Sequence, residues 1–319
     1  MREVYSKALG RNVSAIGFGC ASLGSRISPG GGRRAIDMAL EYGVTWFDVA
    51  PSYGDGQAEE LLGSCLRRQR DRVVICTKVG IARPSLSVSQ RLLRPLARTV
   101  VSTIPAARSV LSRAHRLLPR TAIDPEMIEA SVLQSLRSLR TDHVDVLALH
   151  EPTPEEATDK RIFDVLERLL DRGFIRAISV AGRPDSIIAS VSRSLRVDYA
   201  QFRDGPHNGV AIRLRAELPR ESRPQFVTHG AFGTKNWNEI SMLSSRASET
   251  LKCGLEGHDP HATELAADLL LHFAFSNNPD GVVITSMFSA SHVEHNCSLA
   301  AKSPAPELAA KVHSLLKSK

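Results

Sequence analysis

Short runs of apolar and β-branched residues alternate along the chain with longer segments in which apolar residues recur every three or four positions. The short runs have the length of buried strands, and the longer segments have the spacing of amphipathic helices. The predicted strands cover residues 15–18, 45–48, 73–77, 144–149, 177–180, 199–202, 225–228 and 281–284. The predicted helices cover residues 33–42, 57–68, 125–139, 161–172, 184–191, 210–218, 263–276 and 291–300.

The eightfold alternation of one strand with one helix favours a parallel sheet that closes into a (β/α)8 TIM barrel. The Asp124-Pro125 pair adds a capping residue and a first-turn proline where the third helix begins. A doubly wound sheet is the structural alternative. It usually carries a G-x-G-x-x-G motif after its first strand, and the stretch GFGCASLG at 17–24 does not fit that motif. We therefore predict a single α/β barrel domain over residues 1–319.

Two segments depart from the regular alternation. Residues 2–14 precede the first barrel strand and are predicted to form a β-hairpin that closes the bottom of the barrel. Residues 80–123 form a long insertion after the third strand, at the face where barrel enzymes build their sites. Its apolar spacing predicts an amphipathic helix. Its role stays open between a packed cover, a substrate lid or anion-recognising flap, and a membrane or nucleic-acid contact. The absence of aromatic residues disfavours the last.

Composition indicates a globular protein with a large core, since 42% of the 319 residues are hydrophobic and 24% are charged. No run reaches the roughly 18 apolar residues of a membrane span, and the N-terminal stretch lacks the features of a signal peptide. The five cysteines are scattered without a CxxC pair, which favours reduced thiols and a cytoplasmic protein. No histidine pair has metal-ligand spacing with a third ligand nearby, so we expect no metal.

The net charge of +7 comes from one segment of the chain. Residues 81–123 contain eight arginines and no Lys, Asp or Glu. The rest of the chain carries 33 basic and 34 acidic residues, because eight of the 41 basic residues lie in that segment. The basic balance is therefore local, and we expect no nucleic-acid partner.

Four polar residues lie at or just after the ends of early predicted strands. Asp48 and Lys78 end the second and third strands, His150 follows the fourth, and Tyr53 lies five residues after Asp48. Taken singly, each residue also fits another role. Asp48 fits a helix cap, Tyr53 a packed aromatic residue and His150 a core histidine. Lys78 fits either a surface lysine or a Schiff-base nucleophile. Together they indicate a site, because the carboxyl ends of barrel strands meet at one mouth.

These side chains suit carbonyl reduction. Hydride addition leaves negative charge on the carbonyl oxygen, which must then receive a proton. A phenol is a poor acid at neutral pH, with an ordinary pKa of about 10, and an ammonium group nearby lowers that value. We therefore predict that Lys78 lowers the pKa of Tyr53, that Asp48 keeps Lys78 charged, and that a neutral His150 orients the substrate oxygen.

The sequence blocks around these residues resemble the aldo-keto reductase family along nearly the whole chain. FDVAPSYGDGQAEELLG contains Asp48 and Tyr53, CTKVG contains Lys78, and LALHEP contains His150. The resemblance implies a barrel that holds NAD(P)H, usually NADPH, extended across its mouth without a Rossmann fold. It also implies catalytic roles for Asp48, Tyr53, Lys78 and His150.

The resemblance further implies cofactor contacts at Gly19, Cys20, Ala21, Asp48, Ala181, Gly182, Gln201, His229, Gly230, Ala231, Phe232, Gly233, Ser286, His292 and Asn296. Several of these depart from the family pattern. Ala181-Gly182 replaces a Ser-Asn pair, and His229 stands where an aromatic residue usually stacks on the nicotinamide. His292 and His295 replace an Arg and a Glu, whereas Asn296 is kept. The resemblance implies NADP. Without Lys or Arg at these positions, the bidentate grip on a 2′-phosphate is missing, so NAD is the alternative.

The leading hypothesis is an NAD(P)-dependent oxidoreductase that interconverts a carbonyl (aldehyde, ketone or sugar) and an alcohol, with Tyr53 as proton donor. One alternative is a barrel with weak or lost cofactor binding that serves regulation or assembly. Another is a lyase or isomerase that forms a Schiff base on Lys78. Arg203, His207 and Trp237 are candidate substrate-side residues. The sequence leaves the substrate, the reaction direction and the oligomeric state open, and the only partner expected is a small molecule.

Overall fold

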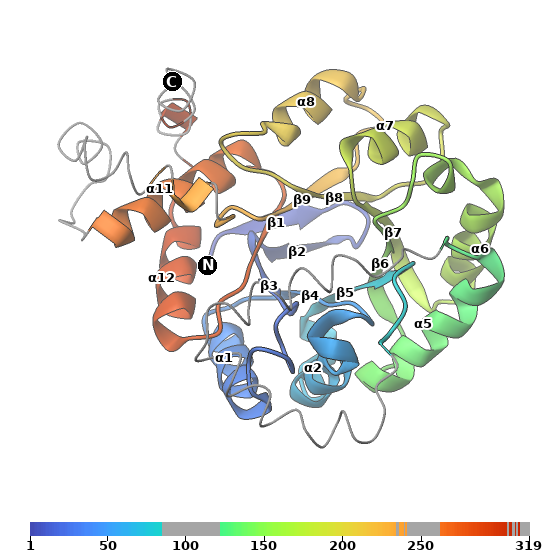
Figure 1. The fold of residues 1–319 in the computed structure, drawn as a ribbon, viewed down its shortest axis with the longest axis horizontal. Helices are drawn as coiled ribbons and strands as arrows, with labels where there is room; N and C mark the ends of the chain where they lie inside the picture. The colour runs from blue at the N-terminus through green and yellow to red at the C-terminus, as the bar shows by residue number, and fades with distance from the viewer. Residues whose placement is uncertain are drawn as a thin grey trace.

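Eight parallel strands form a closed barrel in the computed structural model of the chain (Figure 1). They are hydrogen-bonded in chain order, and the last strand pairs with the first to close the barrel. The strands are β3 (Ile16–Gly19), β4 (Trp46–Asp48), β5 (Val74–Val79), β6 (Val144–His150), β7 (Ile175–Ala181), β8 (Tyr199–Arg203), β9 (Gln225–His229) and β10 (Val282–Thr285). This confirms the predicted fold. The structure describes residues 1–84, 122–233, 236–238, 240, 262–304, 306, 307, 310 and 312.

A helix follows each barrel strand, and the helices surround the strands in Figure 1. They are α1 (Pro29–Glu41), α2 (Ala58–Leu66), α5 (Pro125–Leu139), α6 (Lys160–Asp171), α7 (Pro184–Ser192), α8 (Val210–Glu217), α11 (Ala262–Asn277) and α12 (Ala290–Ala301). Short 3-10 turns lie in three loops: η1 (Tyr53–Gly56), η2 (Arg70–Arg72) and η3 (Glu156–Thr158). The eight predicted helices agree with these bounds to within a few residues.

Helix α5 shows how the local sequence sets these bounds. The Asp124 side chain accepts a hydrogen bond from the Glu126 amide at 3.0 Å, and Pro125 occupies the first helical position. Such a cap contributes about 1 kcal/mol, and proline fits there because its missing N–H has no partner in the first turn. The helix ends at Leu139, before Arg140, which adopts a left-handed conformation with φ of 55°.

The predicted N-terminal hairpin is formed by β1 (Glu3–Ser6) and β2 (Arg11–Ser14). Val4 and Val13 belong to the same apolar cluster as Trp46 and Tyr199 inside the barrel. The Ser6 hydroxyl also hydrogen-bonds the buried Tyr199 hydroxyl. The hairpin therefore closes the end of the barrel where the strands begin.

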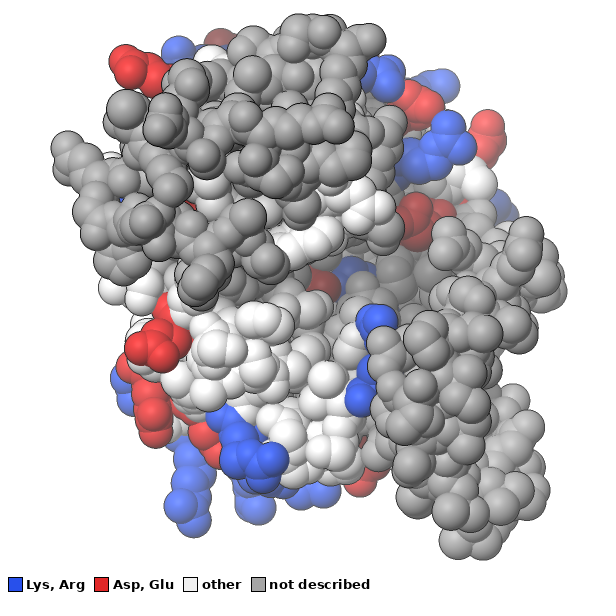
Figure 2. All heavy atoms as spheres, turned by 60° about the vertical axis from the view of Figure 1, so that its left-hand side comes forward, with Lys and Arg blue, Asp and Glu red and all other residues white. Residues whose placement is uncertain are grey.

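The predicted helix in the insertion lies outside the described residues, as does Cys253. The other four cysteines are free thiols. No helix in the described part of the chain combines the length and the apolar run that a membrane crossing requires. On the face drawn in Figure 2, the described surface is mostly uncharged at its centre. Basic and acidic side chains lie mainly along its edges, with both signs mixed.

Candidate active site

The site begins from the alternation of side chains along the barrel strands. Alternate residues of a strand point to the same side, and the lower inward positions, such as Trp46, Val74 and Val146, form an apolar cluster inside the barrel. Two or more positions further along the same strands come Asp48 on β4, Lys78 on β5 and His150 on β6. The fold therefore brings these predicted residues to one mouth, above an apolar floor.

Asp48 and Lys78 form a buried ion pair at the centre of this mouth. The Lys78 Nζ atom donates to the Asp48 Oδ1 atom at 2.6 Å and to the Val49 carbonyl at 3.2 Å. From the opposite wall, Gln201 donates its Nε2 to the same Oδ1 atom at 2.9 Å. Asp48 and Lys78 are only 3% and 2% exposed. Because both charges are out of water, removing either one leaves the other without compensation.

Tyr53 lies over this pair. The Lys78 Nζ atom lies 4.8 Å from the centre of the Tyr53 ring, and the ring meets His150 edge-on with centroids 5.8 Å apart. The structure thus brings together all four residues that the sequence singled out. An ammonium group this close to a phenol favours its ionised form.

The pKa values follow from burial and from these charges. Burial is the largest single effect on the pKa of Lys78 and lowers it, but Asp48, Tyr53 and Cys76 together outweigh burial and raise that pKa above its ordinary value. For Tyr53, burial raises the pKa to about 12, and the charge of Lys78 offsets only part of the rise. The predicted effect of Lys78 on the Tyr53 pKa is therefore present, but the net shift is upward. Lys78 acts as expected, but desolvation of the phenolate is the larger effect.

His150 is neutral in the physiological range. Burial lowers its pKa to about 3, and the charges of Lys78 and His229 act in the same direction. Its Nδ1 atom is buried and has no hydrogen-bond partner among the described residues. A neutral imidazole has one donor and one acceptor nitrogen, so it can hydrogen-bond an oxygen bound in the mouth.

The loop that carries Tyr53 depends on Gly54. Its φ is +58°, and a Cβ atom at this position would lie 1.7 Å from the Leu23 carbonyl oxygen. No other residue fits there without moving the backbone. The close approach holds the Tyr53 turn against the loop that follows β3.

A second polar network, which the sequence did not reveal, lies behind this loop. Glu59 is fully buried; it accepts from the Thr77 hydroxyl at 2.7 Å and from the Arg83 Nη2 atom at 2.5 Å. Arg83 also donates to the Gly56 carbonyl and, at 3.1 Å, to the Ser138 hydroxyl. The network ties the Tyr53 turn to the strand that carries Lys78. Neither Glu59 nor its neighbour Glu60 stands out in the sequence, because only the helix phase decides which one is buried.

The predicted cofactor residues lie at the ends of β3 and β7 to β10. Gly19 ends β3, and Cys20 and Ala21 follow it, with the Cys20 amide bonded to the Asp48 carbonyl at 2.8 Å. Ala181 ends β7, and the Gly182 amide donates to the Gln201 carbonyl at 2.9 Å. All of these positions therefore border the same mouth, mainly through backbone groups.

The mouth continues over β9 and β10. His229 ends β9, and the turn of Gly230, Ala231, Phe232 and Gly233 follows it, closed by a Gly233-to-Gly230 backbone bond of 3.0 Å. Burial lowers the pKa of His229 to about 4, so this imidazole is also neutral near pH 7. Ser286 follows β10, and its hydroxyl donates to the Gly19 carbonyl at 3.5 Å.

Helix α12 begins close to β10 and carries the last two predicted cofactor residues. The His292 amide bonds the hydroxyl of the capping Ser289 at 3.2 Å, and the His292 side chain is exposed. Asn296 is buried and donates to the Thr285 hydroxyl at 3.5 Å. No lysine or arginine lies in the described stretch 282–301, so a phosphate near α12 would meet no strong cation there.

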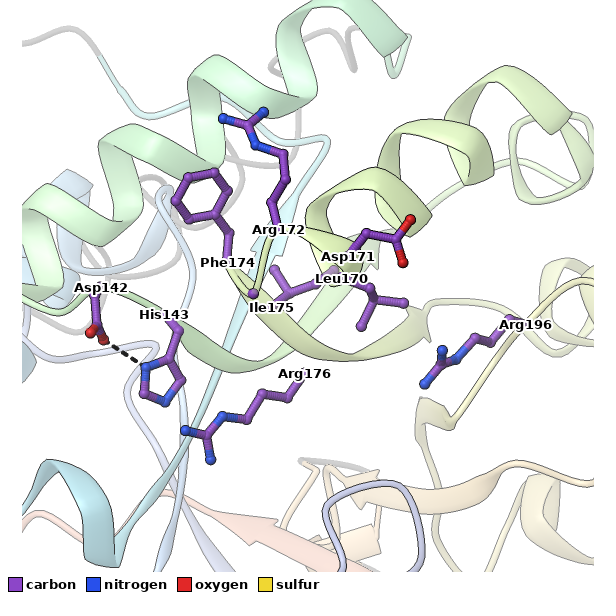
Figure 3. A pocket seen from close by; sticks show the side chains of 10 residues that line it. Asp142, His143, Leu170, Asp171, Arg172, Phe174, Ile175, Arg176 and Arg196 are labelled. Atoms are coloured by element: carbon purple, nitrogen blue, oxygen red, sulfur yellow. Dashed lines mark hydrogen bonds and ion pairs between the residues drawn. The ribbon is translucent and has the colours of Figure 1, made fainter.

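An open hollow of about 730 Å³ lies at the other end of the barrel (Figure 3). It is lined by residues that precede or begin β6, β7 and β8, including His143, Arg176 and Arg196. Its cations already have acidic neighbours, for example Arg172 with Glu129 at 2.6 Å and Arg196 with Asp198 at 3.4 Å. The hollow is therefore separate from the four-residue site. Among the described residues, no group of three His, Cys, Asp or Glu side chains is placed to hold a metal.

Comparison with known proteins identifies relatives of this barrel. Residues 15–202 match the model of the aldo/keto reductase family. D-threo-aldose 1-dehydrogenase from a Pseudomonas species is 26% identical over 202 residues, which is 61% of this chain and 58% of that protein. Aldo-keto reductase YhdN from Bacillus subtilis is 29% identical over 178 residues, which is 54% of this chain and 44% of that protein. The chain thus spans about half the length of these curated relatives.

A solved structure agrees over a longer stretch. The aldo-keto reductase from Klebsiella pneumoniae, determined in complex with NADPH, superposes with a TM-score of 0.68. The match covers 99% of this chain and 95% of that one at 18% identity. At this identity the likeness concerns the fold, which is the same closed barrel.

Proposed function

Because the chain belongs to the aldo/keto reductase family, we propose that it is an NAD(P)-dependent oxidoreductase that interconverts a carbonyl and an alcohol, with Tyr53 as the proton donor. The observation that carries this proposal is the buried Asp48–Lys78 ion pair beneath the Tyr53 ring, with a neutral His150 at the ring edge. A cation beneath a phenol and a neutral imidazole beside it form the arrangement that carbonyl reduction requires.

The reaction follows from the charges of this site. When bound, the dihydronicotinamide supplies a hydride to the carbonyl carbon, and the electron pair of the C=O bond moves onto oxygen. Tyr53 donates its proton to that oxygen, and Lys78 stabilises the resulting phenolate. Although the pKa of Tyr53 is about 12, an alkoxide is a stronger base than a phenolate, so the transfer remains favourable. Asp48 keeps Lys78 charged, and neutral His150 holds the oxygen by a hydrogen bond.

The residues around the mouth fit a nicotinamide cofactor. The Gln201 side chain lies at the floor and hydrogen-bonds Asp48, and the His150 Nδ1 atom has no partner among the described residues. The NADPH bound by the Klebsiella relative supports the same cofactor class here. We propose NADP as the cofactor, with NAD as the alternative because α12 lacks an arginine or lysine. The dehydrogenase name of the Pseudomonas relative supports sugars among the candidate substrates.

The test compares wild type with Tyr53→Phe. Fluorescence titration with NADPH and NADH measures binding, and a panel of small aldehydes and aldoses measures turnover. Wild type is expected to bind and turn over, and Tyr53→Phe to bind equally well and lose turnover by about 10²–10⁴-fold. A Tyr53→Phe variant with near wild-type kcat would overturn the proton-donor role.

The departures at Ala181-Gly182, His229 and His292 favour a second candidate. In it, the barrel binds nucleotide weakly or not at all and acts in regulation or assembly. If wild type binds neither nucleotide at millimolar concentration, this second candidate is favoured and the oxidoreductase proposal fails.

A further inference from the structure

Arg203 is a charged residue at the mouth that the proposed mechanism does not use. Along β8, Tyr199, Gln201 and Arg203 occupy alternate positions and therefore share one side of the strand. Tyr199 lies in the apolar cluster inside the barrel, and Gln201, two residues nearer the mouth, donates a hydrogen bond to Asp48. Arg203 follows two residues after Gln201, is paired in register with His229 on β9, and is exposed.

The Arg203 side chain lies along the glycine turn that follows β9. A Cβ atom at Gly230 would lie 3.0 Å from the Arg203 Cγ atom, and one at Gly233 would lie 3.4 Å from its Nη1 atom. The guanidinium therefore reaches from the barrel wall to the far end of this turn. Gly230 adopts φ of +83°, which favours glycine, and its missing side chain leaves room for the arginine stem.

The Arg203 guanidinium has no carboxylate partner among the described residues. Several exposed arginines of the described chain have carboxylate partners, as in Arg161 with Asp159 at 2.7 Å and Arg213 with Glu217 at 2.7 Å. The other cation of the mouth, Lys78, is paired with Asp48. In the described mouth, the unpaired positive charge is therefore that of Arg203, and it also contributes to the low pKa of His229.

We propose that Arg203 is the anion-binding residue of this site, which grips a phosphate or carboxylate of a bound ligand through its planar guanidinium. Such a group forms two parallel charge-assisted hydrogen bonds with either anion. The anion has two sources: a phosphate of the dinucleotide, or an acidic group on the carbonyl substrate. The proposal rests on the proposed function for the identity of these ligands.

Arg203 supplies the mouth with a cation that α12 lacks. Ser286, His292 and Asn296 bring no lysine or arginine to a bound phosphate, whereas Arg203 offers a guanidinium on the neighbouring turn. A phosphate or carboxylate bound there would also neutralise a charge that has no carboxylate partner in the described part of the chain.

The test uses Arg203→Gln, which removes the charge, Arg203→Lys, which keeps it without the planar fork, and Arg213→Gln as a control on an exposed arginine of α8. Three measurements are made on each protein: the affinities for NADPH and NADH, the kcat/KM ratio of 4-carboxybenzaldehyde to 4-methylbenzaldehyde, and calorimetric binding of inorganic diphosphate. The last probe does not depend on turnover.

Arg203→Gln is expected to weaken diphosphate binding by about tenfold or more, Arg203→Lys by less, and Arg213→Gln not at all. A parallel loss of NADPH and NADH affinity assigns the anion to the cofactor diphosphate, and a loss for NADPH alone assigns it to the 2′-phosphate. A collapse of the preference for the carboxylated aldehyde assigns it to the substrate. Unchanged values in all three measurements for Arg203→Gln overturn the proposal.

Failure of the proposed function gives a different pattern. If wild type reduces no carbonyl and binds no nucleotide but binds diphosphate in an Arg203-dependent manner, the anion site stands and the oxidoreductase proposal fails. If wild type turns over both aldehydes and Arg203→Gln behaves as wild type throughout, the oxidoreductase proposal stands and the anion site fails.

Discussion

The two sides of the barrel mouth differ in how their polar groups are partnered. On the side of β4 to β6, Lys78 contacts both Asp48 and Tyr53, and the Glu59–Arg83 network supports the Tyr53 turn. On the side of β7 to β10, Ala181-Gly182 offers backbone, and the Arg203 guanidinium has no carboxylate partner among the described residues. Apart from the His150 Nδ1 atom, the polar groups of the first side are partnered within the described protein, whereas the second side keeps a charge without a carboxylate partner there. The proposals assign proton chemistry to the first side and anion binding to the second, and single substitutions can distinguish the two.

The largest expected effect is on the side of β4 to β6. Lys78→Met should lower kcat by about 10³-fold, because the Tyr53 phenolate loses its cation. It should also lower the free energy of unfolding by about 3–5 kcal/mol, because Asp48 is left as an uncompensated buried charge. Steady-state kinetics and urea unfolding measure the two effects.

The double variant Asp48→Asn with Lys78→Met is the control for this prediction. Removing the unpaired charge should recover much of the stability without recovering turnover. A Lys78→Met protein that keeps more than about a tenth of wild-type kcat would contradict a proton role of this size.

The Glu59–Arg83 network supports the Tyr53 turn but contains none of the proposed reacting groups. Substitutions in it therefore test whether the position of Tyr53 alone affects turnover. Arg83→Ala should lower kcat by about 10- to 100-fold through a misplaced Tyr53 hydroxyl. NADPH affinity should change little, and Arg83→Lys should recover part of the turnover. Arg172→Ala, which removes an exposed ion pair at the other end of the barrel, is the matched control. Equal losses of kcat and of NADPH affinity would assign the network to general stability instead.

On the binding side, His292→Arg should strengthen NADPH binding by up to about tenfold and leave NADH binding unchanged, because it restores a cation for the 2′-phosphate. His292→Gln is the control that changes the side chain without adding charge. Fluorescence titration at low and high salt measures the affinities, and the gain should shrink at high salt. An equal gain for both nucleotides would place residue 292 away from the 2′-phosphate.

The smallest effect concerns stability against acid. Burial lowers the pKa values of His150 and His229 to about 3 and about 4, whereas unfolded histidines titrate near pH 6.5. Between these values the unfolded chain binds more protons, so stability falls as pH falls from about 6.5 towards 4. His229→Phe should remove about 1–2 kcal/mol of the stability lost between pH 7 and 5. Urea unfolding at the two pH values measures it, and an unchanged difference would show that His229 is not desolvated in the folded protein.

The fold and the four catalytic candidates were predictable from the sequence because they follow from periodicity. Apolar runs set the strands, and residues such as Lys78 and His150 at strand ends must meet at one mouth. The bounds of α5 were predictable to the residue, because Asp124 and Pro125 form a cap that depends on local sequence alone. The net direction of the Tyr53 pKa shift was not predictable from the sequence, because it depends on how far burial of the phenol outweighs the Lys78 charge.

The remaining features depend on tertiary packing. Glu59 is buried and Glu60 is exposed, although they are neighbours of the same type, and only the docking of α2 decides between them. That Arg203 has no carboxylate partner within the described ranges likewise depends on which side chains lie nearby in space. Its inward position was nevertheless readable from the alternation of Tyr199, Gln201 and Arg203 along YAQFR.

The hairpin that closes the bottom of the barrel has a kinetic consequence. With Val4 and Val13 packed into the interior and Ser6 bonded to Tyr199, the described residues fill the barrel at that end. Two ligands that react at the mouth must therefore enter and leave through the same open end of the barrel. The ligand that lies deeper must arrive first and leave last, so the proposed reaction would proceed by a compulsory order of binding and release.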